Sequence, residues 1–176
     1  MRIANIVQDS IVDGPGLRFV VFVQGCTHGC KGCHNPDTHD PSGGYEISVG
    51  KILEMIWKNP LVQGLTISGG EPFDQARDCS QLARAASDMG LDVWVYTGYR
   101  YEDIIAANLP EWDRLLMLTD VLVDGPFIES QKSYEAKFRG SKNQRLIDMG
   151  WTAIGGEVVL WKPPKDELEK FEVPES

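Results

Sequence analysis

The sequence predicts an α/β fold in which a mainly parallel sheet is wound into a partial, open (β/α) barrel. Two observations lead to this prediction. Short runs rich in β-branched and aromatic residues alternate along the chain with segments of helical periodicity. Strands that alternate with helices form right-handed βαβ units, and such units build parallel sheets. The runs are fewer than the eight strands that close a complete barrel, so the predicted barrel stays open.

The regular elements are predicted mainly between residues 17 and 123. Strands are expected at residues 17–24, 64–68, 91–96 and 120–123, and helices at residues 48–58, 74–89, 101–108 and 111–118. Ser48 is a suitable N-cap for the first helix, and Gly90 is a suitable stop for the second. A further strand is expected from Ala153 to Trp161.

The domain organisation is expected to be simple. A chain of 176 residues suits one compact domain, which we place at residues 1–150, followed by a C-terminal extension of unknown role at residues 151–176. From Pro163 to Ser176 the sequence is charged and interrupted by proline. We therefore expect the last dozen residues to form a flexible or loosely docked tail.

Composition and charge exclude some classes of function. The net charge is −9, with 26 acidic and 17 basic side chains, which argues against a nucleic-acid partner because phosphate binding needs a positive surface. The N-terminus lacks the basic and apolar regions of a signal peptide, and the longest apolar run, residues 17–23, is too short to cross a membrane. We therefore expect a cytoplasmic protein without a membrane partner.

Unusual motifs follow each of the four predicted strands. A cysteine-rich loop begins at Gly25, a Ser-Gly-Gly-Glu-Pro stretch occupies residues 68–72, Thr97 follows the third strand, and an Asp-Gly-Pro-Phe stretch occupies residues 124–127. In parallel sheets, binding and catalytic groups gather in the loops after the carboxyl ends of the strands. The four motifs therefore predict one active face.

The cysteine-rich loop is the strongest signal. Cys26, Cys30 and Cys33 fall within eight residues of a chain that has four cysteines. A reducing cytosol disfavours disulfides, so clustered thiols indicate a metal site or redox chemistry. Closely spaced thiolates can hold an iron–sulfur cube, and three of them leave one iron open for catalysis.

A fourth ligand remains an alternative. Cys79 has the helical spacing of Leu82, Ala83 and Ala86, which predicts a small core residue. A histidine would complete a zinc site of the Cys3His type, and the candidates are His28, His34 and His39. For His28, we prefer the interpretation as a solvent-tolerant spacer in the loop to the interpretation as a ligand.

Several stretches together resemble the radical S-adenosylmethionine enzymes, and more narrowly the activases of glycyl-radical enzymes. They are residues 13–18, the cysteine loop through Asn35, and residues 68–72. Residues 93–99, 122–127 and 138–145 are similar to the activating proteins of anaerobic ribonucleotide reductase. The resemblance extends from about Asp9 to Ile147, and it implies an open barrel of the radical S-adenosylmethionine type.

The resemblance implies both the cofactors and the partner. A [4Fe–4S] cluster on Cys26, Cys30 and Cys33 would bind S-adenosylmethionine at its open iron and cleave it with one electron. The resulting 5′-deoxyadenosyl radical would take a hydrogen atom from a glycine of anaerobic ribonucleotide reductase. The electron donor would be a protein such as flavodoxin or ferredoxin, although no motif identifies it. Association with a second copy of the chain, as a homodimer, is an alternative that the sequence leaves open.

The resemblance also implies which residues contact S-adenosylmethionine. Gly69 and Gly70 would let its methionine part approach the sheet edge, and Glu71 would accept from its ammonium group. In isolation, the same stretch is a strand–helix turn with a surface glutamate. Thr97 would contact the methionine or ribose part. His34 and Asn35 would hydrogen-bond the cluster sulfurs and tune its potential.

Two further groups are candidates for the active face. Asp13 and Gly14 lie in a tight turn that the resemblance places near the radical site, with Arg18 available to a carboxylate or to the incoming glycine loop. The second group forms a basic, amide-rich patch that would neutralise the cofactor carboxylate, dock the reductase, or simply be solvated. It comprises Arg139, Lys142, Asn143, Gln144 and Arg145.

Two rival functions remain. One is an activase for another glycyl-radical enzyme, such as a formate lyase, which would carry the same cysteine loop. The other is a non-catalytic zinc or iron–sulfur binding module, which would have a closed site with four ligands and would not respond to S-adenosylmethionine.

Overall fold

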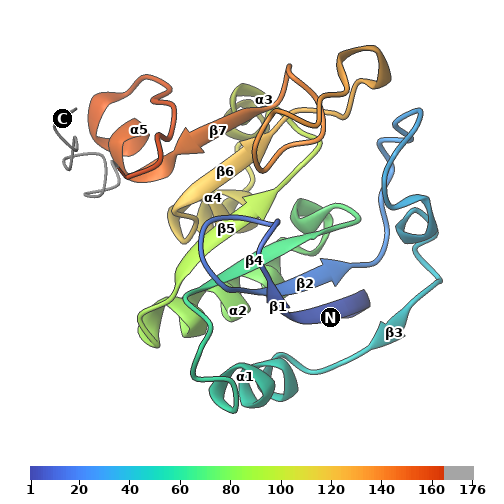
Figure 1. Ribbon diagram of the computed structural model, residues 1–176, viewed down its shortest axis with the longest axis vertical. Coiled ribbons are helices and arrows are strands. Elements are labelled where there is room, and N and C mark those ends of the chain that lie inside the picture. Colours follow the sequence, from blue (N-terminus) through green and yellow to red (C-terminus); the bar gives the residue numbers. More distant parts are fainter. Residues whose placement is uncertain (165–176) are drawn as a thin grey trace, which may run out of the picture.

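Residues 1–164, which the computed structural model describes, form a seven-stranded mixed sheet in the order β3-β1-β2-β4-β5-β6-β7 (Figure 1). The four central strands are parallel: β2 (Arg18–Val23), β4 (Gly64–Gly69), β5 (Asp92–Tyr96) and β6 (Val121–Asp124). Antiparallel strands flank them: β1 (Arg2–Ser10), β3 (Tyr45–Glu46) and β7 (Arg145–Asp148). Because β3 and β7 end the sheet on opposite edges, the barrel is open, which confirms the predicted fold class.

Helices connect the parallel strands and cover one face of the sheet. They are α1 (Val49–Trp57), α2 (Ala76–Asp88), α3 (Tyr101–Ala107) and α4 (Pro110–Met117), with α5 (Met149–Gly155) after β7. Three short 3-10 turns, η1 (Pro36–Thr38), η2 (Pro72–Gln75) and η3 (Glu129–Gln131), lie within the loops. Ser48 caps α1 as expected, because its hydroxyl accepts from the amide of Lys51.

The strands bury both faces, which explains why they read as continuous apolar runs. Val21, Ile67 and Val95 point towards the helices and join a core that includes Ile52 of α1 and Leu82 of α2. Alternate residues point to the other face, where a smaller cluster contains Trp94, Val121 and Val123. This second cluster is covered partly by Phe138 and Trp161 instead of by a helix.

The predicted strands and helices between residues 17 and 123 are all present, and their ends differ slightly from the expected positions. The helix expected at residues 74–89 is divided into η2 and α2. The sequence analysis missed β1, β7 and the two-residue strand β3. Their polar residues mask the apolar alternation that identifies a strand, because these antiparallel strands are less buried than the central ones.

The strand predicted from Ala153 to Trp161 is wrong. Its first part belongs to α5, which is capped by the Asp148 side chain accepting from the amide of Trp151. Only Leu160 forms a bridge, to Ile147. The proposed domain boundary at residue 150 falls inside α5 and remains a prediction, and the predicted tail lies in residues 165–176, outside the described part.

Candidate functional site

A cavity of about 450 Å³ lies at the carboxyl ends of the parallel strands. This volume is in the range typical of small-molecule sites. All four predicted motifs contribute to the cavity wall: the cysteine loop, the residues after β4, the residues after β5 and the residues after β6. Of the predicted site residues, the wall includes Cys26, Cys30, Cys33, His34, Asn35, Gly69, Gly70, Thr97, Asp13, Arg139 and Gln144.

The three cysteines of the loop all line this cavity and carry free thiols. The loop is tied down by its backbone, since the amide of Cys26 donates to the carbonyl of His39 over 3.1 Å. The amide of Asn35 donates to the sulfur of Cys33 over 3.4 Å, which places one N–H group against a candidate ligand. Soft thiolates facing a cavity fit an iron–sulfur cluster.

The thiol of Cys26 is protonated at neutral pH in the free protein. Burial, with a smaller contribution from Glu71, raises its pKa to about 11. A bound metal would therefore have to displace the proton of this thiol. Within residues 1–164, no three His, Cys, Asp or Glu side chains are grouped tightly enough to hold a single ion.

Cys79 lies in the core, as predicted. Its side chain on α2 is fully buried among apolar residues, and it is not part of the cavity wall. Burial raises the pKa of its thiol far above the ordinary value.

Glu71 is fully buried, so the interpretation as a surface glutamate is wrong. Its carboxylate accepts four hydrogen bonds from the protein. Oε1 accepts from the amide of Phe73 at 3.0 Å and from the hydroxyl of Thr97 at 2.8 Å. Oε2 accepts from the amide of Gly98 at 2.9 Å and lies 2.6 Å from Nε2 of His28. An ionised carboxylate has about four acceptor sites, so a cofactor ammonium group would compete with these four donors, and the expected contact with Glu71 stays a prediction.

His28 is not the solvent-tolerant spacer that the sequence suggested. Its side chain is 17% exposed and contacts Glu71, and its ring packs edge-on against Tyr99 with the centroids 4.4 Å apart. The hydrogen bond with Glu71 raises the pKa of this imidazole. No local sequence pattern signals this contact, because the two residues are 43 positions apart.

The two glycines after β4 permit close packing between strands. A Cβ atom on Gly69 would lie 2.6 Å from the backbone of Phe22, and one on Gly70 would overlap the carbonyl oxygen of Gly25. Gly69 also has a φ of 96°, which disfavours other residues. The absence of side chains here therefore serves the packing of β4 against β2 and the cysteine loop, besides leaving the cavity open.

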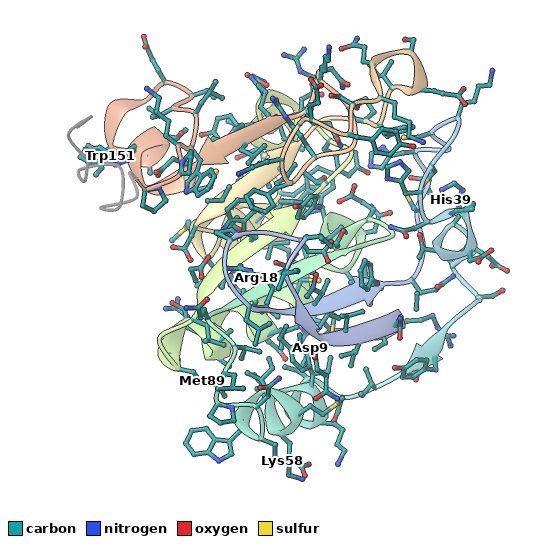
Figure 2. The ribbon with its side chains drawn as sticks, viewed as in Figure 1. Asp9, Arg18, His39, Lys58, Met89 and Trp151 are labelled. Atoms are coloured by element: carbon teal, nitrogen blue, oxygen red, sulfur yellow. The ribbon has the colours of Figure 1, made fainter. Side chains whose placement is uncertain are left out.

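Arg18 lies away from the active face, contrary to expectation. It is fully buried at the start of β2, where its guanidinium donates to Asp92, Thr66 and the carbonyl of Leu65. Figure 2 shows it near the middle of the molecule, well separated from His39 beside the cysteine loop. The carboxylate that it binds is therefore a structural one at the opposite ends of the strands.

The loop before β2 links these two ends of the strands. The carboxylate of Asp13 accepts from the hydroxyl of Ser10 at 2.5 Å, and its backbone carbonyl accepts from Thr66 at 2.8 Å. Asp13 lines the cavity, as expected. Gly14 has a φ of 136° and lies against Arg18 and Trp94, so a side chain at this position would strain the backbone and crowd both residues.

Comparison with known proteins identifies the family. The family described as "4Fe-4S single cluster domain" matches residues 12–147. The anaerobic ribonucleoside-triphosphate reductase-activating protein of Enterobacteria phage T4 is 34% identical over 168 residues, covering 92% of this chain and 99% of that protein. The protein of that name from Escherichia coli (strain K12) is 37% identical over 144 residues, covering 76% and 90%. The chain belongs to this family of activating proteins.

A solved structure is also similar. The crystal structure of QueE from Escherichia coli has a TM-score of 0.46 and 18% sequence identity, and the match covers 55% of this chain and 52% of that one.

In this member of the activating-protein family, the predicted basic patch does not form one surface. Arg145 lies on β7, where it pairs with the buried Asp124 at 2.5 Å and with Glu102 at 2.8 Å. Gln144 bonds the loop backbone at Gly125, Gly140 and Ser141, and Asn143 donates to the carbonyl of Pro126. Arg139 lines the cavity and donates to the carbonyl of Gln144. These residues mainly fold the loop that forms one cavity wall.

The sequence analysis placed Phe127 on the active face with its Asp-Gly-Pro-Phe stretch, but it missed that Phe127 and Phe138 together make this wall aromatic. Phe127 and Phe138 line the cavity, and the ring of His34 packs against Phe127 with the centroids 4.9 Å apart. The Asp-Gly-Pro-Phe stretch was noted at a strand end, but its contact with the cysteine loop depends on the fold.

No helix within residues 1–164 combines the length and the apolar character that a bilayer crossing requires.

Proposed function

We propose that this protein activates an anaerobic ribonucleoside-triphosphate reductase, using S-adenosylmethionine and a [4Fe–4S] cluster held by Cys26, Cys30 and Cys33. The observation that carries the proposal is the cavity at the strand ends: three thiols of one loop line it, in a chain of the activating-protein family. Three ligands leave a coordination position free, which a purely structural site does not need.

The cofactors carry the reaction itself. When bound, the cluster and S-adenosylmethionine supply the one-electron chemistry that removes a hydrogen atom from a glycine of the reductase. The three cysteines would hold the cluster, and the amide of Asn35 donates a hydrogen bond to the sulfur of Cys33. Phe127 and Phe138 give the cavity an aromatic wall, which would help to exclude water from the reacting groups once a partner covers the cavity.

The cavity is open to solvent, and a protein partner would close it during the reaction. The reductase takes this role in our proposal. A flavodoxin or ferredoxin is the proposed electron donor, and a homodimer is compatible with the proposal. We place the protein in the cytoplasm, where thiols stay reduced, and assign it no nucleic-acid partner because its net charge is −9.

The test begins with the purified protein, reconstituted with iron and sulfide without oxygen and then reduced. Electron paramagnetic resonance is recorded with and without S-adenosylmethionine. We expect a four-iron signal that changes shape on addition of the cofactor. Alanine at Cys26, Cys30 or Cys33 should abolish this signal, and the matched variant Cys79→Ala should keep it. A spectrum that does not change when S-adenosylmethionine is added would contradict the enzymatic function and favour a metal-binding module.

The partner is tested by adding either the reductase or a formate lyase to the reduced, loaded protein. We expect a glycyl radical on the reductase. A radical on the lyase alone would show an activase with a different target.

A further inference from the structure

The cysteine loop and the sheet edge are joined by a contact between the partly buried His28 and the fully buried Glu71. His28 stands in the middle of the loop, two residues after Cys26 and two before Cys30. Its Nε2 atom lies 2.6 Å from the carboxylate of Glu71, which follows β4 directly. The contact therefore connects the centre of the candidate cluster loop to the end of a central strand.

Glu71 is held rigidly on the sheet side of this contact. Three of its four donors belong to the scaffold: the amides of Phe73 and Gly98, and the hydroxyl of Thr97. These groups come from η2 and from the turn after β5, so the carboxylate ties two strand ends together. The fourth donor, His28, is the one that comes from the cysteine loop.

The imidazole occupies a fitted site. Tyr99 packs edge-on against the ring, and the amide of Tyr99 donates to Thr97, which in turn donates to Glu71. A Cβ atom on Gly98 would lie 2.5 Å from the imidazole, so the turn has no side chain where the ring lies. The turn after β5 thus fixes both the ring and the carboxylate that it contacts.

We propose that His28 is a positioning residue that acts through Glu71. It holds the cysteine loop against the ends of β4 and β5, and so sets where the cluster stands relative to the S-adenosylmethionine cavity. This inference rests on the proposed function. In this role Glu71 acts on the cofactor through the loop, whether or not it also contacts the cofactor directly.

The test uses the full-length protein with His28→Ala and His28→Gln. The amide of glutamine can still donate to Glu71, whereas alanine cannot. Lys31→Ala is the matched control, because Lys31 lies in the same loop and its side chain is 91% exposed. For each reconstituted variant, iron content, the midpoint of thermal unfolding and the Kd for S-adenosylmethionine are measured, the last from the cofactor-induced change in the reduced spectrum.

We expect His28→Ala to raise the Kd at least tenfold with little change in unfolding midpoint. His28→Gln should recover most of the affinity, and Lys31→Ala should match the wild type. If His28→Ala loses iron and His28→Gln retains it, this result would also support the inference, because it would show that His28 holds the loop in place while the cluster assembles. Wild-type affinity in His28→Ala, or equal losses in both variants, would overturn the inference.

A second measurement separates this inference from the proposed function. Hydrogen–deuterium exchange of the metal-free protein is followed in peptides that cover residues 26–33. We expect faster exchange in His28→Ala than in Lys31→Ala or His28→Gln. If the wild type binds no S-adenosylmethionine, the proposed function fails, while this exchange still decides whether His28 holds the loop. Unchanged exchange in His28→Ala would overturn the inference by itself.

Discussion

Buried polar side chains determine much of the geometry at the scale of single residues. Arg18, Glu71 and Asp124 are each at most 1% exposed, and each has several hydrogen-bond partners. Burying such groups is unfavourable unless they are paired, so each of them fixes the position of its partners. The sequence does not reveal most of these partners because they lie in other strands, helices and loops, far away along the chain.

Arg18→Ala should destabilise the protein without altering its cavity. The change removes bonds to Asp92, Thr66 and the carbonyl of Leu65, and leaves a void beside Trp94. We expect the free energy of unfolding to fall by about 3 kcal/mol, measured by urea denaturation of the metal-free protein. Unchanged stability combined with a loss of reductase activation would instead assign Arg18 to the active face.

Cys79 should be unreactive in the native protein. Its thiol is fully buried, and burial raises its pKa, so little thiolate is available to an alkylating reagent. In the metal-free protein, we expect iodoacetamide to modify Cys30 or Cys33 before Cys79, as mapped by peptide mass spectrometry. In urea, which unfolds the protein, Cys79 should be modified as fast as Cys30 and Cys33. Early modification of Cys79 in the folded state would contradict its placement in the core.

At the scale of elements, the antiparallel strand β7 is attached to the parallel sheet by charge as well as by backbone pairing. Arg145 on β7 contacts Asp124 at the end of β6 and Glu102 on α3. The hydrogen bonds from Arg145 lower the pKa of Glu102 to about 2. The ion pair thus joins three elements on one side of the cavity.

Glu102→Gln should reveal this pairing as a pH dependence of stability. Because the folded-state pKa is lowered from an ordinary value of 4.5, the charged pair contributes fully above that value. Its contribution disappears as the pH falls towards 2. Glu102 is half exposed, so we expect the variant to be less stable at pH 6 by at most about 1 kcal/mol.

Urea unfolding at several pH values checks this prediction. The wild type and Glu102→Gln should converge as the pH falls below 4. A constant difference at all pH values would contradict the assigned role of the charge.

At the scale of the whole molecule, Trp161, which lies after the residues that match the family (12–147), covers part of the apolar cluster around Trp94. The ring of Trp161 packs on Trp94 with the centroids 5.0 Å apart, and its amide donates to the carbonyl of Leu146. Phe138, which lines the cavity, contacts the same aromatic cluster. Trp161, which lies beyond residue 147, is therefore packed against the face of the sheet that supports the site.

Trp161→Ala should lower the free energy of unfolding by about 2 kcal/mol, because the half-buried indole leaves a void beside Trp94. Trp151→Ala is the matched control: this tryptophan lies on α5, nearby in sequence, but is 63% exposed. We expect it to change stability by at most about 0.5 kcal/mol. Equal effects of the two substitutions in urea denaturation would show that Trp161 has no special packing role.

The sequence by itself determined the alternation of strands and helices, the spacing of Cys26, Cys30 and Cys33, and the placement of their loop after a buried strand. It also placed Cys79 in the core. These features depend on residues close in the chain, where periodicity and turn chemistry act directly. The polar strands β1 and β7 gave no such signal.

Only the tertiary structure decided how the polar residues pair. It joined His28 to Glu71, buried Arg18 against Asp92, and placed Arg145 beside Asp124 instead of at a docking surface. Each of these contacts spans at least 21 positions. Which donor meets which acceptor depends on the order of strands in the sheet, because strand order brings distant chain segments to the same edge.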